Sequence, residues 1–246
     1  HDERCQREAD GRARQLLRAD AVHRQWLQGT PGRGSRGLYG RGIEKNTIIF
    51  FASDNGSPAT DGTGMYGELN SIKKFDHNPS YKSRGIKADI WEGGHHIPFF
   101  IKWPGMVAEN STCANTISLN DFMATCADLF KKALPDNAGE DSYSLLPLLF
   151  HKKKKYKRNY TIHLSSGGYF AIRKDKWKLI MCAGSGGWTS PVPGKEEVGL
   201  PEVQLFNIKN DPGEKKNLYL EYPAKVEELK ALLVTCVKEG RSTSGI

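Results

Sequence analysis

One run of residues restricts the fold of this chain more than any other. Residues 46–53 form a continuous apolar, β-branched and aromatic stretch. Such a run is typical of a strand that is buried on both faces, as in a parallel sheet covered by helices. A second apolar run at 99–103 stops at Pro104-Gly105, and apolar residues at helical spacing between 119 and 133 predict one buried helix face. That face would consist of Leu119, Phe122, Met123, Cys126, Leu129 and Phe130. We therefore expect an α/β sheet domain.

The last hundred residues have a different character. Apolar and polar residues alternate over 169–181 around Lys174-Asp175, which predicts an antiparallel hairpin, and 204–207 reads as a further strand. Pro223 opens an amphipathic terminal helix. Its apolar side carries Val226, Leu229, Leu232, Leu233, Cys236 and Val237. Strands with one packed helix predict a small α+β subdomain at the end of the α/β sheet.

Arginine and lysine are unevenly distributed along the chain. The net charge is +8, and residues 1–42 hold nine of the 13 arginines and no lysine, whereas all 23 lysines follow. A single fold has no physical reason to change cation at one point, so we expect 1–42 to have a separate origin. Apart from Trp26 and Tyr39 it lacks interleaved aromatic residues, which disfavours a nucleic-acid-binding arm. No apolar run approaches the ~18 residues of a membrane helix.

Several polar residues are candidates for chemistry. Asp54 and Asn55 follow the first strand directly and offer hard oxygen ligands for Ca²⁺ or Mg²⁺, although Asp-Asn-Gly is also good turn chemistry. His77 lies in a long polar loop, where a lone histidine is often only solvated. Lys87 offers a point positive charge to an oxyanion. The basic run 152–158 is either an anion-binding patch or a solvated loop.

Short motifs in a fixed order carry a family resemblance. They are Ser53-Asp54-Asn55-Gly56, then Gly85-Ile86-Lys87 with Trp91-Glu92-Gly93-Gly94 and Pro98, then Trp103-Pro104-Gly105, and finally Leu205-Phe206-Asn207-Ile208 with Asn210-Asp211-Pro212-Gly213-Glu214. From about Gly42 to Gly240 the chain resembles the sulfatases, the arylsulfatase-type members of the alkaline phosphatase superfamily. The resemblance covers the later part of such an enzyme. It implies that 43–150 is the end of the catalytic α/β/α domain and that 151–246 is the carboxyl-terminal α+β subdomain.

The resemblance also implies an activity and a site. It implies a sulfuric ester hydrolase that acts on sulfated carbohydrates or aryl sulfate esters. Asp54 and Asn55 match two ligands of the active-site calcium, which is magnesium in some members. Lys87 matches the lysine that contacts the sulfate group, and His77 lies more loosely where a substrate contact is often found. The family's formylglycine nucleophile arises from a Cys/Ser-x-Pro-x-Arg motif, which this sequence lacks. We therefore expect a fragment that is inactive by itself, from a parent that is periplasmic, secreted or lysosomal, although no signal peptide is visible.

A second class of function is open at this stage. The chain could be a non-catalytic protein that binds sulfated glycans or another polyanion through Lys87 and the 152–158 run. Such binding would be sensitive to salt and independent of metal. We favour the hydrolase because an Asp-Asn pair has no use in simple polyanion binding.

Overall fold

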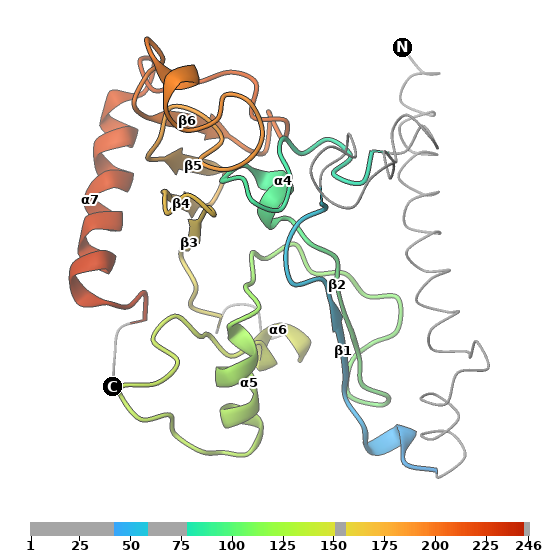
Figure 1. The fold of residues 1–246 in the computed structure, drawn as a ribbon. Coiled ribbons are helices and arrows are strands. Elements are labelled where there is room, and N and C mark those ends of the chain that lie inside the picture. The colour runs from blue at the N-terminus through green and yellow to red at the C-terminus, as the bar shows by residue number, and fades with distance from the viewer. Residues whose placement is uncertain (1–41, 59–77, 151–155, 244–246) are drawn as a thin grey trace. The chain divides into compact units, whose positions relative to one another are not determined.

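The computed structural model describes residues 42–58, 78–150 and 156–243 (Figure 1). Its elements are the 3-10 helix η1 (Glu44–Asn46), strand β1 (Ile49–Ala52), helix α4 (Glu92–His95), strand β2 (Phe99–Lys102), helices α5 (Asp121–Leu129) and α6 (Leu146–Leu149), strands β3 (Thr161–Leu164), β4 (Phe170–Lys174) and β5 (Trp177–Ile180), the 3-10 helix η3 (Lys195–Glu197), strand β6 (Gln204–Asn207) and helix α7 (Pro223–Glu239). His77, the Arg-rich residues before Gly42 and most of the 152–158 run lie outside the described residues.

The chain divides into two compact units. Residues 1–49 and 101–109 form one, and residues 50–100 and 110–246 form the other. In the described part of the first unit, the Thr47 hydroxyl donates a hydrogen bond of 2.8 Å to the carbonyl oxygen of Ile43, beside η1. The second unit contains the four-stranded sheet and every candidate residue discussed below. The domain boundaries expected after residues 42 and 150 stay predictions.

The four-stranded sheet is antiparallel throughout, in the order β3-β4-β5-β6. The predicted hairpin is confirmed as β4 and β5, with Ala171 opposite Ile180. Since side chains alternate along a strand, each face of the sheet takes every second residue. One face packs on α7, which confirms the predicted terminal helix. The buried residues of this contact are Ile172, Leu179, Leu205, Val226, Leu229 and Leu233.

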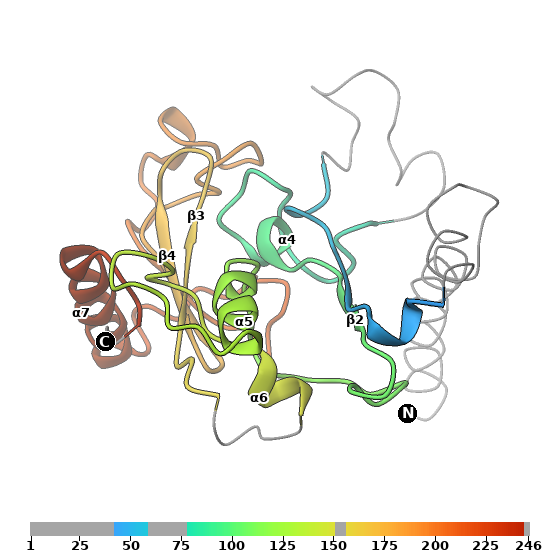
Figure 2. The ribbon, with the colours of Figure 1, turned by 90° about the horizontal axis from the view of Figure 1, so that it is seen from below.

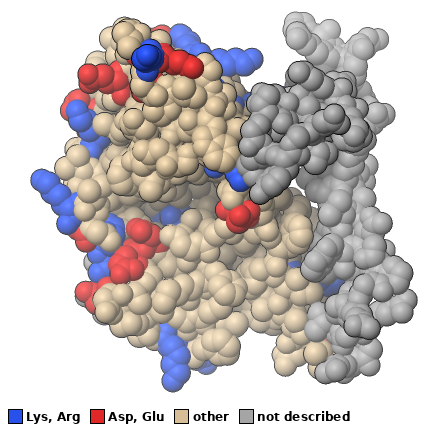
Figure 3. Space-filling model, in the orientation of Figure 1, with Lys and Arg blue, Asp and Glu red and all other residues tan. Residues whose placement is uncertain are grey.

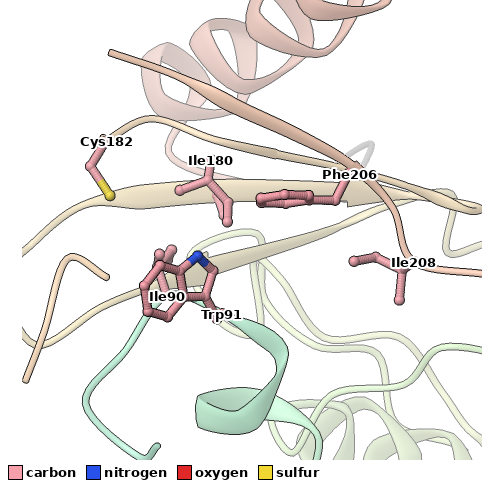
Figure 4. Packing of buried hydrophobic residues seen from close by; sticks show 7 residues of the cluster. Ile90, Trp91, Ile180, Cys182, Phe206 and Ile208 are labelled. Carbon is pink, nitrogen blue, oxygen red and sulfur yellow. The ribbon is translucent and has the colours of Figure 1, made fainter. Parts of the chain in front are cut away.

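The other face of the sheet contacts the segment that leads into α4. Ile90 and Trp91 are fully buried there against Ile180 and Phe206 (Figure 4). The indole N–H of Trp91 donates a 3.2 Å hydrogen bond to the side-chain oxygen of Gln204, which fixes the ring on the sheet. Viewed from below, α7 and α4 lie on opposite sides of β3 and β4 (Figure 2). The sheet therefore has a side under α7 whose buried residues are apolar, and a mixed side that faces α4.

Strands β1 and β2 pair with each other in a second, two-stranded sheet. The N–H of Ser53 donates to the carbonyl of Pro98, and the Phe51 and Phe100 rings lie 6.1 Å apart. The expectation that this strand is buried on both faces is wrong, because β1 is half-buried at its first three residues and exposed at Ala52. Within the described residues β1 pairs with β2 alone, so its other edge has no neighbouring strand.

Helix α5 forms where its period predicts, but the buried face is a different one. Phe122, Met123 and Phe130 are exposed by 52%, 46% and 71%, whereas Asp121 and Thr125 are buried. The Asp121 carboxylate pairs with the Arg158 guanidinium and accepts the N–H groups of Ser118 and Tyr143. These polar contacts orient the helix. None of the helices in the described ranges is long and apolar enough to cross a membrane.

Candidate functional site

The turn after β1 presents two oxygen-bearing side chains, Asp54 and Asn55. Asp54 is exposed and Asn55 is half-buried. The Ser53 hydroxyl donates a 2.8 Å hydrogen bond to the backbone carbonyl of Asn55, which holds the turn closed. Within the described residues, neither the Asp54 carboxylate nor the Asn55 amide forms a hydrogen bond or ion pair. Both groups are therefore free to bind a ligand.

Three glycines bring this turn to the segment that carries Lys87. A Cβ atom placed on Gly56 would lie 1.9 Å from the carbonyl oxygen of Gly93, and one on Gly93 would lie 2.1 Å from that of Gly85. Only glycine permits backbones to approach so closely. The Gly56 N–H donates to Gly94, and the Lys87 N–H donates to Ser57, both at 2.9 Å. Backbone contacts thus hold the Asp54-Asn55 turn, α4 and the Lys87 segment together.

The Lys87 side chain reaches an aromatic ring on a distant loop. It is half-buried, and its ammonium lies 5.3 Å from the centre of the Trp188 ring. Trp188 follows a run of small residues, Ala183 to Gly187. Contact between Lys87 and this loop was not predicted, because nothing local in the sequence links residues a hundred positions apart.

Behind α4 lies a buried group of charges that the sequence did not reveal. The Lys178 ammonium, fully buried on β5, lies 3.0 Å from one oxygen of Glu92 and 3.1 Å from Glu214. The second oxygen of Glu92 accepts a 2.8 Å hydrogen bond from Arg173. Glu214 also accepts the backbone N–H of Glu92 at 2.7 Å. These four side chains, Glu92, Arg173, Lys178 and Glu214, are called the buried charge cluster below.

The two carboxylates of the buried charge cluster differ in their electrostatics. Burial raises the pKa of Glu92, but the charges of Lys178 and Arg173 outweigh that effect and leave its pKa at about 2. Burial raises the pKa of Glu214 to about 7, since the charge of Lys178 offsets only part of that effect and the nearby charge of Glu92 adds to it. Glu92 is therefore ionised at neutral pH, whereas Glu214 is poised between its two protonation states.

Two histidines border the same cluster. The rings of His95 and His163 meet edge to face with their centres 4.7 Å apart. Burial, with the charge of Lys178, lowers the pKa of His95 to about 4 and moves the pKa of His163 well below its usual value. Both rings are therefore neutral at pH 7. No three His, Cys, Asp or Glu side chains among the described residues converge as metal ligands.

Comparison with known proteins shows which family the chain is similar to. Residues 37–132 match the family model for sulfatases. The chain is 34% identical to an N-acetylgalactosamine-6-O-sulfatase of Bacteroides thetaiotaomicron, over 78% of this chain and 36% of the relative. It is 29% identical to arylsulfatase G of Rattus norvegicus, over 71% of this chain and 34% of the relative. The chain thus spans about a third of the length of these relatives.

A solved structure shows a similar fold. A Bacteroides thetaiotaomicron protein, described in connection with the metabolism of multiple glycosaminoglycans, superposes with a TM-score of 0.68 at 33% identity. The match covers 80% of this chain and 40% of that protein. The α/β fold followed by the antiparallel sheet and terminal helix is therefore a sulfatase fold. The chain is thus similar, in sequence and in fold, to the later part of the sulfatases, as its motifs predicted.

Proposed function

We propose that this chain supplies a metal-binding and sulfate-binding part of a sulfuric ester hydrolase. One observation carries the proposal: the backbone contacts of Gly56, Gly93 and Gly85 hold the Asp54-Asn55 turn and the Lys87 segment together. That arrangement holds a carboxylate, an amide oxygen and an ammonium on segments that are joined by backbone contacts. These are the groups needed to hold a cation and an anion side by side.

Asp54 and Asn55 fit two positions in the shell of a Ca²⁺ ion, with Mg²⁺ as the alternative. Their oxygens are hard ligands, they form no hydrogen bond or ion pair with the part of the chain that the structure describes, and their turn is held by Gly56 in advance of binding. Calcium takes about 6–8 oxygens, so the other ligands come from beyond these two residues. A bound cation would withdraw charge from the sulfate oxygens. Lys87 would hold a further sulfate oxygen with its ammonium, and none of the three residues provides a nucleophile.

We further propose a sulfated carbohydrate as the substrate and an exported parent protein. The relative named N-acetylgalactosamine-6-O-sulfatase supports the carbohydrate, whereas the relatives named arylsulfatase keep aryl sulfate esters as the alternative. His77 stays a proposed substrate contact. The other class of function, simple polyanion binding, is less well supported because Arg158 of the basic run is committed to Asp121. On the face shown in Figure 3, basic and acidic side chains are also interspersed.

Calcium titration of Asp54→Asn tests the metal half of the proposal. The substitution keeps the size of the side chain and removes its charge, so we expect the calcium dissociation constant to rise at least about tenfold. Asp175→Asn is the matched control, because Asp175 is an aspartate in the β4-β5 turn, where its φ of 53° suits asparagine. Equal calcium affinity in both variants, with unchanged binding of heparin, would favour the polyanion-binding class instead.

A further inference from the structure

An exposed tryptophan stands next to the proposed sulfate contact. Trp188 leaves 51% of its surface exposed, although the residues just before it, Gly184 to Gly186, are buried. Tryptophan is mostly buried in proteins, and its exposed rings are enriched where a partner is bound. The ring lies beside Lys87, whose ammonium is 5.3 Å from its centre.

A single buried carboxylate fixes this juxtaposition. Asp89 is fully buried, and one of its oxygens accepts the backbone N–H groups of Trp188 at 2.8 Å and Thr189 at 3.1 Å. Its other oxygen accepts the N–H of Ile86 at 2.8 Å and the Thr189 hydroxyl at 2.5 Å. Asp89 therefore ties the backbone on each side of Lys87 to the backbone of Trp188.

Glycine lets the tryptophan loop approach closely enough for these bonds. A Cβ on Gly187 would lie 2.4 Å from the carbonyl oxygen of Ala88 and 2.7 Å from the Asp89 carboxylate. The N–H of Ile90 also donates to the carbonyl of Ser185 at 2.8 Å. The backbone of the loop is thus held from several sides, which lowers the cost of ordering it when a ligand binds.

We propose that Trp188 is a sugar-stacking platform that selects a carbohydrate as the carrier of the sulfate ester. The inference rests on the proposed role of Lys87. An ester whose sulfate reaches the Lys87 ammonium has its adjoining carbon skeleton next to the indole. The C–H groups on the face of a pyranose ring are weakly positive, and they match the negative face of an indole. A small alkyl sulfate has no such face.

Ligand titration of the full 246-residue chain tests the platform. The chain is labelled with ¹⁵N, and the indole N–H signal of Trp188 is identified among its five tryptophans by its loss in Trp188→Phe. Three ligands are compared: N-acetylgalactosamine 6-sulfate, unsulfated N-acetylgalactosamine and methyl sulfate. We expect the sulfated sugar to shift the Trp188 signal. In Trp188→Ala its dissociation constant should rise about tenfold, which corresponds to ~1.4 kcal/mol, while that of methyl sulfate changes less than twofold.

Two further variants separate this inference from the proposed function. Lys87→Met should weaken both sulfated ligands, and Tyr222→Ala should weaken neither, since Tyr222 is an exposed ring that packs beside Trp177. If Trp188→Ala binds the sulfated sugar as tightly as the unsubstituted chain, or loses methyl sulfate equally, the platform is wrong even though Lys87 holds sulfate. If the unsubstituted chain binds neither sulfated ligand, both the platform and the sulfate contact are wrong.

Discussion

Replacing Lys178 by methionine is the sharpest test of the buried charge cluster. Methionine retains the unbranched shape and most of the length of the side chain, and it removes the charge. At an effective dielectric constant of about 20, each attraction at 3.0–3.1 Å is worth roughly 5 kcal/mol before the cost of desolvation. Much of that gain offsets the burial of Lys178 itself. Breaking a buried pair from one side costs about 3–5 kcal/mol, because the remaining charge is left behind.

The expected loss depends on pH in a defined direction. Without Lys178, the pKa of Glu92 and that of Glu214 both rise in the folded state, so the folded variant takes up more protons than the unsubstituted protein. For each additional proton bound in the folded state, the variant regains up to about 1.4 kcal/mol of stability per pH unit, relative to the unsubstituted protein, as the pH falls. We therefore expect a loss of about 3–5 kcal/mol at pH 7 and a loss that is about 1–2 kcal/mol smaller at pH 5.

Urea unfolding at both pH values measures these quantities. Lys174→Met is the matched control, because Lys174 also lies 3.0 Å from a glutamate, Glu228, but at the surface. An exposed pair contributes about 0–1 kcal/mol. The reasoning fails if Lys178→Met loses no more stability than the control, or if its loss is the same at pH 5 and pH 7.

Two other substitutions test single contacts. Gly56→Ala places a Cβ 1.9 Å from the Gly93 carbonyl, so we expect a loss above about 3 kcal/mol and weakened calcium binding; Gly213→Ala, with its nearest atoms at 3.3 Å, should lose less, and an equal urea midpoint would contradict this. Thr125→Val removes a buried hydroxyl that donates to the backbone carbonyl of Asp121 and accepts the N–H of Leu145. We expect it to lower the free energy of unfolding by about 1–3 kcal/mol. Thr235→Val, at the same helical spacing but exposed, should cost nothing measurable, and equal losses in thermal unfolding would refute the role of burial.

The local pattern of the sequence predicted the elements well. Alternation over 169–181 and the apolar spacing after Pro223 gave the β4-β5 hairpin and α7, because each of these elements packs on a single apolar surface. The same reasoning predicted the position of α5 correctly but predicted the wrong face of the helix to be buried. Periodicity locates a helix, yet it does not tell which face meets the protein when a buried Asp121-Arg158 pair outweighs an apolar stripe.

Part of the candidate site was likewise predicted from the sequence, and part of it was missed. The Asp54-Asn55 turn and Lys87 were found because motifs mark them, and their proposed roles as ligands stay predictions. The buried charge cluster was missed because Lys178 occupies a polar position in an alternating hairpin, which normally points to solvent. Glu214 follows a surface turn and meets the Glu92 backbone 122 residues away in sequence. Only the folded chain brings such residues together, so no local signal could have found them.

The central claim is that Asp54 and Lys87 hold the cation and the sulfate of a hydrolase, and turnover tests it most directly. Residues 43–246 would replace the matching region of the Bacteroides thetaiotaomicron N-acetylgalactosamine-6-O-sulfatase, and hydrolysis of N-acetylgalactosamine 6-sulfate would be measured. We predict an active chimera that loses at least about 100-fold in kcat/KM with either Asp54→Asn or Lys87→Met. A folded chimera whose turnover is unchanged by both substitutions would contradict the claim.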